Sequence, residues 1–476
     1  MERYDLAVIG GGTAGLVSAA VAAGIGARTA LVERHRLGGE CLWTGCVPSK
    51  ALVRAAAVAE TVRGAARFGV DGGPPRVDFG RVMERVHAAI AAIEPHDSPE
   101  RFRGLGVDVV QGDARLVSPH EAVVDGRRIH ARRWIVATGS RTAVPDVPGL
   151  REAGYLTHET VWALREMPES MAVLGGGPIG VEMAQAFARL GCRVTLVQSG
   201  GRILERDDPE AAAVLQRVLG REGVAIALHT RAAAVRTEPG AKLVTLRGPD
   251  GERELRVAAV FVATGRAANV EGFGLEEIGV ELGGDGIRVD AVLRTSLANV
   301  WAAGDVVGPY RFTHVADYQA RLAVPNALFP VRRKVDYRVV PWCTFTEPEV
   351  AHVGFTEPEA REQWGDGIGV WRYDHANLDR AVCDGETDGL TKLVTDPAGR
   401  LVGAHVVAPR AGETIHEAVL AIRKRAKLSE LSGMIHVYPT YPESLRRNAD
   451  AYLRAKFSGG LAGKMAGLAR AFVRRG

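Results

Sequence analysis

The chain has 476 residues, which is too many for one ordinary hydrophobic core, so two to four domains are expected. Charged residues make up 24% and hydrophobic residues 46%, as in water-soluble globular proteins, and the formal net charge is only +4. No block of lysine and arginine is long enough to follow a phosphate backbone, which argues against a nucleic-acid partner. Five cysteines and no targeting segment predict the reducing cytoplasm.

An uncharged stretch at residues 6–27, LAVIGGGTAGLVSAAVAAGIGA, is long enough to imitate a membrane span. Glycines interrupt it, however, and the acidic residues Glu2 and Asp5 precede it. A second apolar segment, RTALVER, follows it. The pattern predicts a buried strand, a glycine-rich turn and a helix, and no membrane span.

The segment GGECLWTGCVPSK at residues 38–50 holds two cysteines, Cys41 and Cys46. Because Pro48 fits a helix only in its first turn, a helix is expected to begin near Val47, which places Cys46 at a helix N-terminus, where the dipole favours a thiolate. In a regular helix the two Cα atoms would lie about 8.6 Å apart, whereas a disulfide tolerates only about 7 Å. A bridge therefore requires a distorted turn, which Gly45 permits. A strained and accessible bridge is typical of catalytic disulfides.

The arrangement of residues 6–33 occurs again at residues 172–198, AVLGGGPIGVEMAQAFARLGCRVTLVQ. Each copy has a strand, a GxGxxG turn, a helix and a second strand, and 23 positions separate its first glycine from Glu33 or Gln198. Two complete copies predict two dinucleotide sites. The three glycines permit in turn a tight turn, close approach to a pyrophosphate and helix–sheet packing, and they are Gly10, Gly12 and Gly15 in the first copy and Gly175, Gly177 and Gly180 in the second.

The two copies differ in the residue that ends them. Glu33 can accept hydrogen bonds from both hydroxyls of an adenosine ribose. Gln198 is uncharged and would not repel a 2′-phosphate, and Arg202 lies close to it in the sequence, with Arg193 and Arg206. This favours NADPH in the second site and leaves NADH open, because glutamine can also accept a ribose hydroxyl.

Two further segments, WIVATGS at 134–140 and VFVATGR at 261–267, are both expected to be strands that end in Ala-Thr-Gly, which supports a duplication. VWAAGDVVG at 300–308 predicts a strand that leads to Asp305, where a carboxylate could meet a ligand hydroxyl. The expected α/β fold has a first nucleotide domain at 1–148 and 266–338, a second at 149–265, and a C-terminal α+β unit at 339–476. That unit is expected to contain a hairpin at 389–408 and a helix at 412–426.

Nearly the whole chain resembles the flavin-dependent pyridine nucleotide–disulfide oxidoreductases, the family of dihydrolipoamide dehydrogenase, glutathione reductase and mercuric reductase, and GGECLWTGCVPSK is similar to their redox-active motif. The resemblance implies two Rossmann-like domains, with FAD in the first site and NAD(P)H in the second, and a C-terminal dimerisation domain in a homodimer. It also implies that Cys46 is the sulfur beside the flavin, that Cys41 meets the substrate, and that Lys50 pairs with Glu182. The other implied cofactor contacts are Glu33, Gly112, Ala114, Thr138, Gly139, Ser140, Asp305, Arg311, Phe312, Thr313 and His314 for FAD and Gly265 for the nicotinamide nucleotide.

The segment HVYPTYPE at 436–443 departs from the disulfide reductases of this family, which have histidine where this chain has Tyr438 and glutamate where it has Glu443. Tyrosine titrates near pH 10 and histidine near 6.5, so Tyr438 can donate a proton but cannot form an imidazolium. On a strand, His436 would point along the same face and could act instead; the alternative is a structural or dimer-packing role. Pro178 stands where glutathione reductases have a tyrosine over the flavin, which predicts a more open nicotinamide pocket.

Mercuric reductases also have the tyrosine and the later glutamate, and FTHVADYQARLAVPNALF and VVPWCTFTEPEVAHVG look like their branch of the family. The sequence shows neither their tail cysteine pair nor their N-terminal metal-binding domain, so this chain is expected to lack both. Cys192, Cys343 and Cys383 are expected to be inert buried thiols. The basic tail residues Lys464, Arg470, Arg474 and Arg475 are expected to end a solvated helix, with contact to an acidic membrane or partner as the alternative.

Three functions stay open at this point. In the first, electrons pass from NAD(P)H through FAD to Cys41 and Cys46 and then to a small disulfide or a comparable acceptor. In the second, the acceptor is a soft metal ion, Hg(II) or Cu(II), which is reduced as the substrate of the two thiols. In the third, the chain is the dihydrolipoamide dehydrogenase component of a larger complex, a role that normally relies on the missing histidine.

Overall fold

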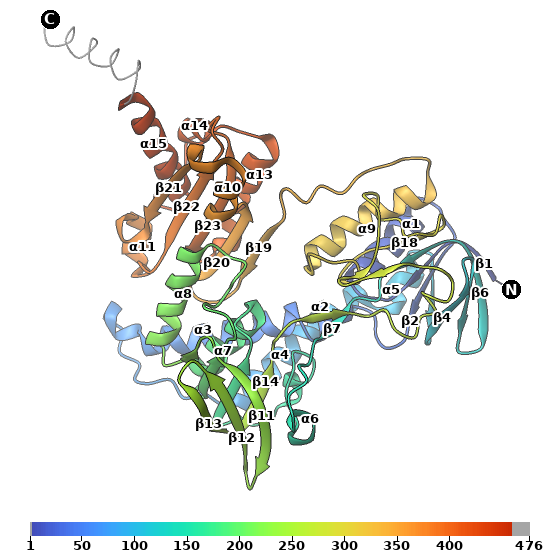
Figure 1. Cartoon of the computed structure of the whole chain (residues 1–476), viewed down its shortest axis with the longest axis horizontal. Helices are drawn as coiled ribbons and strands as arrows, with labels where there is room; N and C mark the ends of the chain where they lie inside the picture. Colours follow the sequence, from blue (N-terminus) through green and yellow to red (C-terminus); the bar gives the residue numbers. More distant parts are fainter. Residues whose placement is uncertain (1, 459–476) are drawn as a thin grey trace, which may run out of the picture. The chain divides into compact units, whose positions relative to one another are not determined.

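The computed structural model describes residues 2–458 (Figure 1), and the basic tail discussed above lies outside them. The described chain divides into two compact units. Unit 1 comprises the residues up to Gly175 with 186–197 and 231–336, and unit 2 comprises 176–185, 198–230 and the described residues from Tyr337 onward. The division into three domains stays a prediction. Within residues 2–458, no helix combines the length and the apolar character that crossing a bilayer requires.

The first sheet of unit 1 contains the strand–turn–helix–strand expected near the N-terminus, which is confirmed as β1 (Glu2–Ile9), α1 (Thr13–Gly24) and β2 (Thr29–Glu33). Its strand order is β3-β2-β1-β6-β5-β4, and β18 pairs with β6. The strands β3, β2, β1, β6 and β18 are parallel, and β5 and β4 extend the sheet antiparallel. The remaining strands are β3 (Val107–Gln111), β4 (Ala114–Ser118), β5 (Glu121–Val124), β6 (Arg127–Val136) and β18 (Val300–Ala302).

Both faces of this sheet are covered. Along β1, Leu6 and Val8 belong to one core cluster, while Ala7 and Ile9 belong to another on the opposite face. On the first of these faces α1 packs against α9 (Thr313–Leu328). Burial on both faces is typical of parallel strands and explains their continuous apolar sequences. The helices α2 (Gly39–Trp43), α3 (Cys46–Arg63), α4 (Phe79–Ile93) and α5 (Pro99–Gly104) follow the second strand.

The second glycine-rich copy is confirmed as β8 (Ser170–Leu174), α7 (Pro178–Leu190) and β9 (Arg193–Val197). In unit 1, β8 pairs in parallel with β9 and with β14 (Ala259–Val262). An antiparallel sheet packs against these strands and contains β11 (Arg231–Glu238), β12 (Ala241–Gly248) and β13 (Gly251–Val257). The strands β6 and β14 end just before the two Ala-Thr-Gly segments, as predicted, and β7 (Ser140–Thr142) and β15 (Arg266–Ala268) follow them and pair antiparallel.

The C-terminal part of unit 2 is an antiparallel sheet of order β19-β20-β23-β22-β21. The hairpin predicted at 389–408 is confirmed by β22 and β23. The helix predicted at 412–426 is confirmed by α12 and α13, which the helical backbone of Ile415 joins, and the left-handed backbone of Arg425 ends it. The other elements of unit 2 are α8 (Pro209–Arg221), β10 (Ala225–Ala227), β19 (Pro341–Thr344), β20 (Glu349–Gly354), α10 (Glu357–Trp364), β21 (Gly369–Asp374), α11 (Asp379–Asp384), β22 (Leu390–Thr395), β23 (Leu401–Ala408), α12 (Ala411–Thr414), α13 (His416–Lys424), α14 (Leu428–Ser432) and α15 (Glu443–Ser458).

Candidate active site

The two cysteines of the 38–50 motif lie on either side of a break between two helices, and we call residues 40–46 the redox turn. The helix α2 carries Cys41 and ends at Trp43, and the N–H groups of Thr44 and Gly45 both donate to the carbonyl of Glu40, at 2.9 and 2.6 Å. The next helix, α3, begins at Cys46. The predicted distorted turn and the predicted place of Cys46 at a helix N-terminus are therefore confirmed.

The two thiols differ in acidity. The Cys41 thiol hydrogen-bonds Cys46 and, with the Thr313 hydroxyl of α9 and the Lys50 charge, lowers the pKa of Cys46 to about 6, against the opposing effects of desolvation and of Glu40. The Cys46 sulfur lies 3.4 Å from the Thr313 hydroxyl. The same hydrogen bond and burial raise the pKa of Cys41 well above its usual value. At neutral pH, Cys46 is therefore the thiolate and Cys41 is the thiol that donates to it.

A charged cluster that the sequence analysis missed lies directly beside Cys41. The guanidinium of Arg266 donates to both carboxylate oxygens of Glu40, with Nη1 at 2.8 Å from Oε1, and the Nε2 atom of His158 lies 3.2 Å from Oε1. Arg266 also donates to the Ser140 hydroxyl, which in turn donates to the Asp305 carboxylate, each at 2.7 Å. Burial would raise the pKa of Glu40, but the hydrogen bond from His158 and the charge of Arg266 together hold it below its usual value. Burial raises the pKa of Asp305.

The first glycine-rich turn has the geometry that an FAD pyrophosphate requires. A Cβ on Gly10, whose φ is +107°, would lie 2.3 Å from the Ala137 carbonyl oxygen, and a Cβ on Gly15 would lie 1.7 Å from the Gly10 oxygen. Gly12 caps α1 without any side-chain hydrogen bond, which leaves N–H groups at the helix start for a phosphate. Glu33 accepts from the backbone N–H of Gly11 at 2.6 Å and keeps lone pairs for ribose hydroxyls. These residues fit the adenosine diphosphate half of FAD.

The other residues that the resemblance implies for FAD come from several elements of unit 1. The backbone of Gly112 has a φ of +141° just before Ala114 begins β4, and the Thr138 hydroxyl donates to the Asn269 carbonyl at 2.7 Å. Gly139 has a φ of +71°. The Arg311 guanidinium donates to the carbonyl oxygens of Asp305 and Asp285, and the rings of Phe312 and His314 stack with centroids 5.3 Å apart. Their contacts with FAD stay a prediction.

The second glycine-rich turn repeats this geometry with an uncharged end. A Cβ on Gly175, whose φ is +109°, would lie 2.3 Å from the Ala263 oxygen, whereas a Cβ on Gly177 would meet nothing within 4 Å. The Oε1 atom of Gln198 accepts from the Gly176 N–H at 2.8 Å, so its amide N–H groups are the ones that can donate to a ligand.

The remaining residues expected at the second site differ in their surroundings. Arg202 donates to the carbonyl of Asp207 at 3.2 Å and to that of Glu205, which ties it to its own loop. Gly180 is buried in α7, and Gly265 has a φ of +146°. The open position of Gly177 fits a nicotinamide nucleotide pyrophosphate.

The C-terminal segment places Tyr438 in the open. Its side chain is 64% exposed, and its hydroxyl donates to Asp379 at 2.7 Å. That hydrogen bond and the Asp379 charge raise the pKa of Tyr438, so the phenol keeps its proton at neutral pH. His436 does not lie on a strand, so the expected alternation with Tyr438 does not apply; its Nε2 atom instead lies 3.0 Å from Glu417. Whether Tyr438 or His436 acts as the acid stays a prediction.

Two carboxylates named in the sequence analysis are buried in unit 2. Glu443 begins α15 and accepts from Arg446 at 2.9 Å and from Arg447 at 2.8 Å. Glu182, on α7, accepts from the backbone N–H of Phe345 at 2.9 Å. The pairing of Glu182 with Lys50 stays a prediction.

The three other cysteines do not share one environment. Cys192 is buried and Cys343 is half-buried, but Cys383 is exposed, so the prediction of a buried thiol is wrong there. The reason is that α11 buries only Ala381, and a residue two positions later in a helix points to nearly the opposite side. Cys383 is therefore open to thiol reagents.

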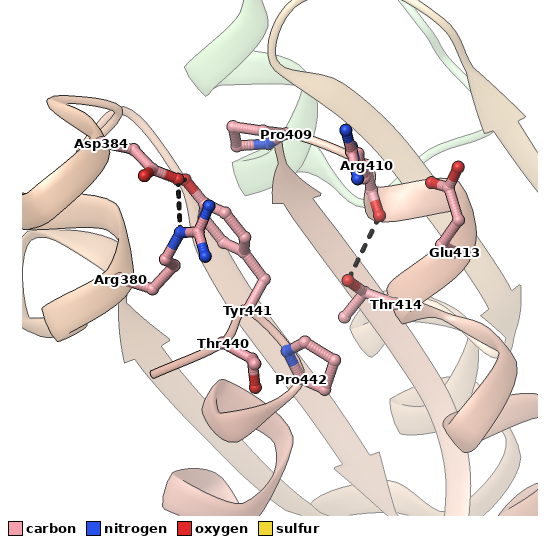
Figure 2. Close-up of a pocket in the computed structure, with 9 residues that line it drawn as sticks. All are labelled: Arg380, Asp384, Pro409, Arg410, Glu413, Thr414, Thr440, Tyr441 and Pro442. Carbon is pink, nitrogen blue, oxygen red and sulfur yellow. Dashed lines mark hydrogen bonds and ion pairs between the residues drawn. The ribbon is translucent and has the colours of Figure 1, made fainter. Parts of the chain in front are cut away.

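Figure 2 shows a pocket of about 430 Å³ that is lined in part by Thr440, Tyr441 and Pro442, just after Tyr438. On one side of it Arg380 donates to Asp384 at 2.7 Å, and the Tyr441 hydroxyl donates to the same carboxylate at 3.1 Å (Figure 2). Arg410 and Glu413 line it from the other side. The lining of the pocket therefore contains side chains of both charges.

Comparison with known proteins gives a consistent result along the chain. The model of the family "Pyridine nucleotide-disulphide oxidoreductase" matches residues 4–320, and the model of that family's dimerisation domain matches residues 340–449. A mercuric reductase of Streptomyces lividans is 36% identical over 457 residues, which are 94% of this chain and 96% of the relative. A dihydrolipoyl dehydrogenase of Thermus scotoductus is 35% identical over 469 residues, which are 95% of this chain and 98% of the relative.

Two solved structures are similar over their whole length. The Cu(II) complex of RclA from Escherichia coli, described as an HOCl-induced flavoprotein disulfide reductase, aligns with a TM-score of 0.85 at 28% identity, covering 95% of this chain and 100% of that one. LpdA of Mycobacterium tuberculosis aligns with the same score, identity and coverage.

Proposed function

Because the chain belongs to the pyridine nucleotide–disulphide oxidoreductase family and is an FAD-dependent NAD(P)H oxidoreductase with that family's dimerisation domain, we propose that it reduces a small disulfide or a comparable acceptor through Cys41 and Cys46. One observation carries the proposal. Cys46 begins α3 in surroundings that lower its pKa to about 6, and the thiol of Cys41 donates to it. A dithiol with one thiolate and one thiol is the reduced form that disulfide exchange needs.

The cofactor sites are proposed from the fit of the residues that form them. Glu33, the start of α1 and the group of Ser140 with Asp305 would hold FAD, and Gly177 and Gln198 would hold NADPH in preference to NADH. When bound, FAD accepts a hydride from the nicotinamide and supplies two electrons to the disulfide. The domain boundaries given above and a cytoplasmic location are proposed with them.

The thiols would then act in two exchange steps. The proton of Cys41 moves along its hydrogen bond to Cys46, and the Cys41 sulfur attacks the acceptor disulfide, which forms a mixed disulfide and releases one thiolate. Cys46 then attacks the Cys41 sulfur and its proton passes to the second acceptor sulfur, which leaves as a thiol while the intramolecular disulfide is restored. The acceptor leaves as two thiols, having taken up two electrons and two protons: the first leaving sulfur takes a proton from Tyr438 of the dimer, the proposed donor, which solvent then reprotonates, and the second takes the proton of Cys46.

A second acceptor class, the soft metal ions Hg(II) and Cu(II), is supported by the identity of residue 438. A disulfide needs a proton donor for its leaving sulfur, and Tyr438 retains its proton because Asp379 raises its pKa. Reduction of a metal ion needs no such donor, so a weak acid at this position is compatible with it. The similarity to mercuric reductases and to the Cu(II) complex of RclA points in the same direction. The role of dihydrolipoamide dehydrogenase component in a larger complex is the least supported of the three.

Anaerobic half-reactions separate these classes. The holoenzyme is reduced with one equivalent of NADPH or NADH and then titrated with oxidised glutathione, oxidised lipoamide, Hg(II) or Cu(II). The acceptor that restores the oxidised flavin spectrum within the turnover time identifies the class. All forms carry Cys383→Ser, because that exposed thiol would bind metal ions on its own.

The matched variants are Cys41→Ser and Cys46→Ser. Each is expected to abolish acceptor reduction while the flavin is still reduced by NADPH. Full turnover in the Cys46→Ser variant would contradict the proposed electron path, and restoration of the spectrum by metal ions alone would replace the disulfide with the metal substrate.

A further inference from the structure

The redox turn is held from outside by one short segment, residues 158–162. The indole Nε1 of Trp162 donates to the carbonyl of Thr44 at 2.9 Å, and also to that of His158 at 2.6 Å. Thr44 lies between the two cysteines. At the other end of the same segment, His158 contacts Glu40 at 3.2 Å, and its Nδ1 atom lies 2.9 Å from the Thr142 hydroxyl. The segment therefore contacts the turn on the Cys41 side and again just before Cys46.

Arg266 strengthens the first of these contacts. Its guanidinium spans both oxygens of Glu40, and a two-point pair of this kind restricts orientation as well as distance. The side chains of Arg266 and His158 are only 14% and 7% exposed, whereas that of Glu40 is 35% exposed. Ser140 in turn accepts from Arg266, which connects the guanidinium to the β7–β15 pair. The carboxylate is thus held by groups that are themselves anchored.

We propose that Glu40 and Trp162 are positioning residues that keep the Cys41 and Cys46 sulfurs within reach of each other. The proposal rests on the proposed function of these cysteines. The N–H groups of Thr44 and Gly45 both donate to the Glu40 carbonyl, so the backbone of the turn is hydrogen-bonded to residue 40. Holding its side chain and the Thr44 carbonyl restricts the turn at two points. Two thiols held in this way have a high effective concentration toward each other, which favours the disulfide.

The charges near the sulfurs determine which variant gives a clean test. Cys46 faces Cys41 and Glu40 from α2, Lys50 from its own helix and the Thr313 hydroxyl from α9, and Cys41 also faces Asp97. Replacing Glu40 changes both position and charge. Replacing Trp162 by phenylalanine changes no charge and removes both hydrogen bonds of the indole N–H, to Thr44 and to His158, so it tests position alone.

The experiment measures the equilibrium between dithiol and disulfide in the holoenzyme. Wild type, Trp162→Phe and Glu40→Gln are equilibrated anaerobically in glutathione buffers with catalytic glutaredoxin, so that equilibrium is reached whatever the natural acceptor is. Samples are then acid-quenched and alkylated, and the fraction with a Cys41–Cys46 disulfide is read by mass spectrometry. Trp134→Phe is the matched control for loss of an indole, because Trp134 is fully buried and its Nε1 has no hydrogen-bond partner among the described residues. Glu159→Gln is the matched control for charge on the same segment, since Glu159 is half exposed and 3.8 Å from His158.

We expect the equilibrium constant for the disulfide to fall at least fivefold in Trp162→Phe and in Glu40→Gln, and to stay within twofold in both controls. Values within twofold of wild type in either test variant, with full flavin content, overturn the proposal. Absence of any Cys41–Cys46 disulfide in wild type under oxidising buffers would instead overturn the proposed function. Should one test variant fail to bind flavin, the other decides.

Discussion

The two glycine-rich copies, residues 6–33 and 172–198, have closely similar backbones. Gly10 and Gly175 have φ values of +107° and +109°, and a Cβ on either would lie 2.3 Å from a carbonyl oxygen. Those oxygens belong to Ala137 and Ala263, which are the alanines of the two Ala-Thr-Gly segments. The backbone at the start of the two glycine-rich turns is therefore the same, and both are expected to receive a pyrophosphate.

The two copies differ in the side chain at their ends. Glu33 and Gln198 each accept from a backbone N–H of their own glycine turn, Gly11 at 2.6 Å and Gly176 at 2.8 Å. After that bond, a carboxylate still offers only acceptors, whereas an amide offers two N–H donors. The difference lies in one atom of the terminal side chain, so we expect the shared backbone to fix where a dinucleotide lies and this atom to set whether the site prefers hydroxyls or tolerates phosphate.

The largest effect is expected where the two turns are alike. Gly10→Ala and Gly175→Ala each push a Cβ into a backbone carbonyl at a positive φ, a strain of about 3 kcal/mol or more. We expect Gly10→Ala to be purified without flavin, and Gly175→Ala to retain flavin but lose its reduction by NADPH. Flavin absorbance per protein and stopped-flow reduction measure the two effects.

Gly177→Ala is the control for folding in that pair. A Cβ there meets nothing within 4 Å, so the melting temperature and flavin content should stay at wild-type values. The KM for NADPH should nevertheless rise by about tenfold, or about 1.4 kcal/mol, because the methyl group fills the space that the pyrophosphate needs. An unchanged KM would show that the second turn does not receive a dinucleotide.

Gln198→Glu tests the difference between the units. Glutamate keeps the acceptor for Gly176 but places a negative charge where a 2′-phosphate would lie. We expect the ratio of kcat/KM for NADPH to that for NADH to fall about 10- to 50-fold, or about 1.4–2.3 kcal/mol. Comparison at low and high salt should show a smaller effect at high salt. A ratio that does not change would assign phosphate recognition to other groups, and Arg206→Gln would then be the next variant.

The pH dependence of the two half-reactions distinguishes the nucleotide sites from the redox turn. The folded pKa of Cys46 is lowered to about 6, so its thiolate is present above that pH and is lost as the pH falls through it. Acceptor reduction should therefore drop about tenfold between pH 7 and pH 5, while flavin reduction by NADPH changes little. Lys50→Gln should move the midpoint upward, since the Lys50 charge helps to lower this pKa. A parallel fall of both half-reactions would place the titrating group elsewhere.

The parts of the site that are formed by residues close together in the sequence could be predicted from the sequence pattern. The glycine turns and the helix start at Cys46 follow from spacing within about 25 residues, and both are confirmed. The Glu40–Arg266 pair joins residues far apart in the chain and was missed, although Ser140 and Arg266 each follow an Ala-Thr-Gly and meet through the pairing of β7 with β15. The side on which a short helix is exposed depends on tertiary packing, which is why Cys383 was misplaced.

The smallest effect is expected from Glu33→Gln, which makes the end of the first glycine-rich copy resemble that of the second. In Glu33→Gln, the side chain should still accept from the Gly11 N–H, because Gln198 does so in the equivalent place. What is lost is the negative charge and the second carboxylate oxygen, which accepts from the His35 N–H at 2.7 Å and has a further lone pair for a ribose hydroxyl, and hydrogen bonds to a charged group are worth more than neutral ones. We expect FAD to bind about three- to tenfold more weakly, measured by fluorescence on rebinding to apoprotein, with the melting temperature of the holoenzyme lowered when FAD is limiting. A loss as complete as that of Gly10→Ala would mean that the carboxylate holds the turn itself, and the two units would then differ in construction and not only in the ligand that they select.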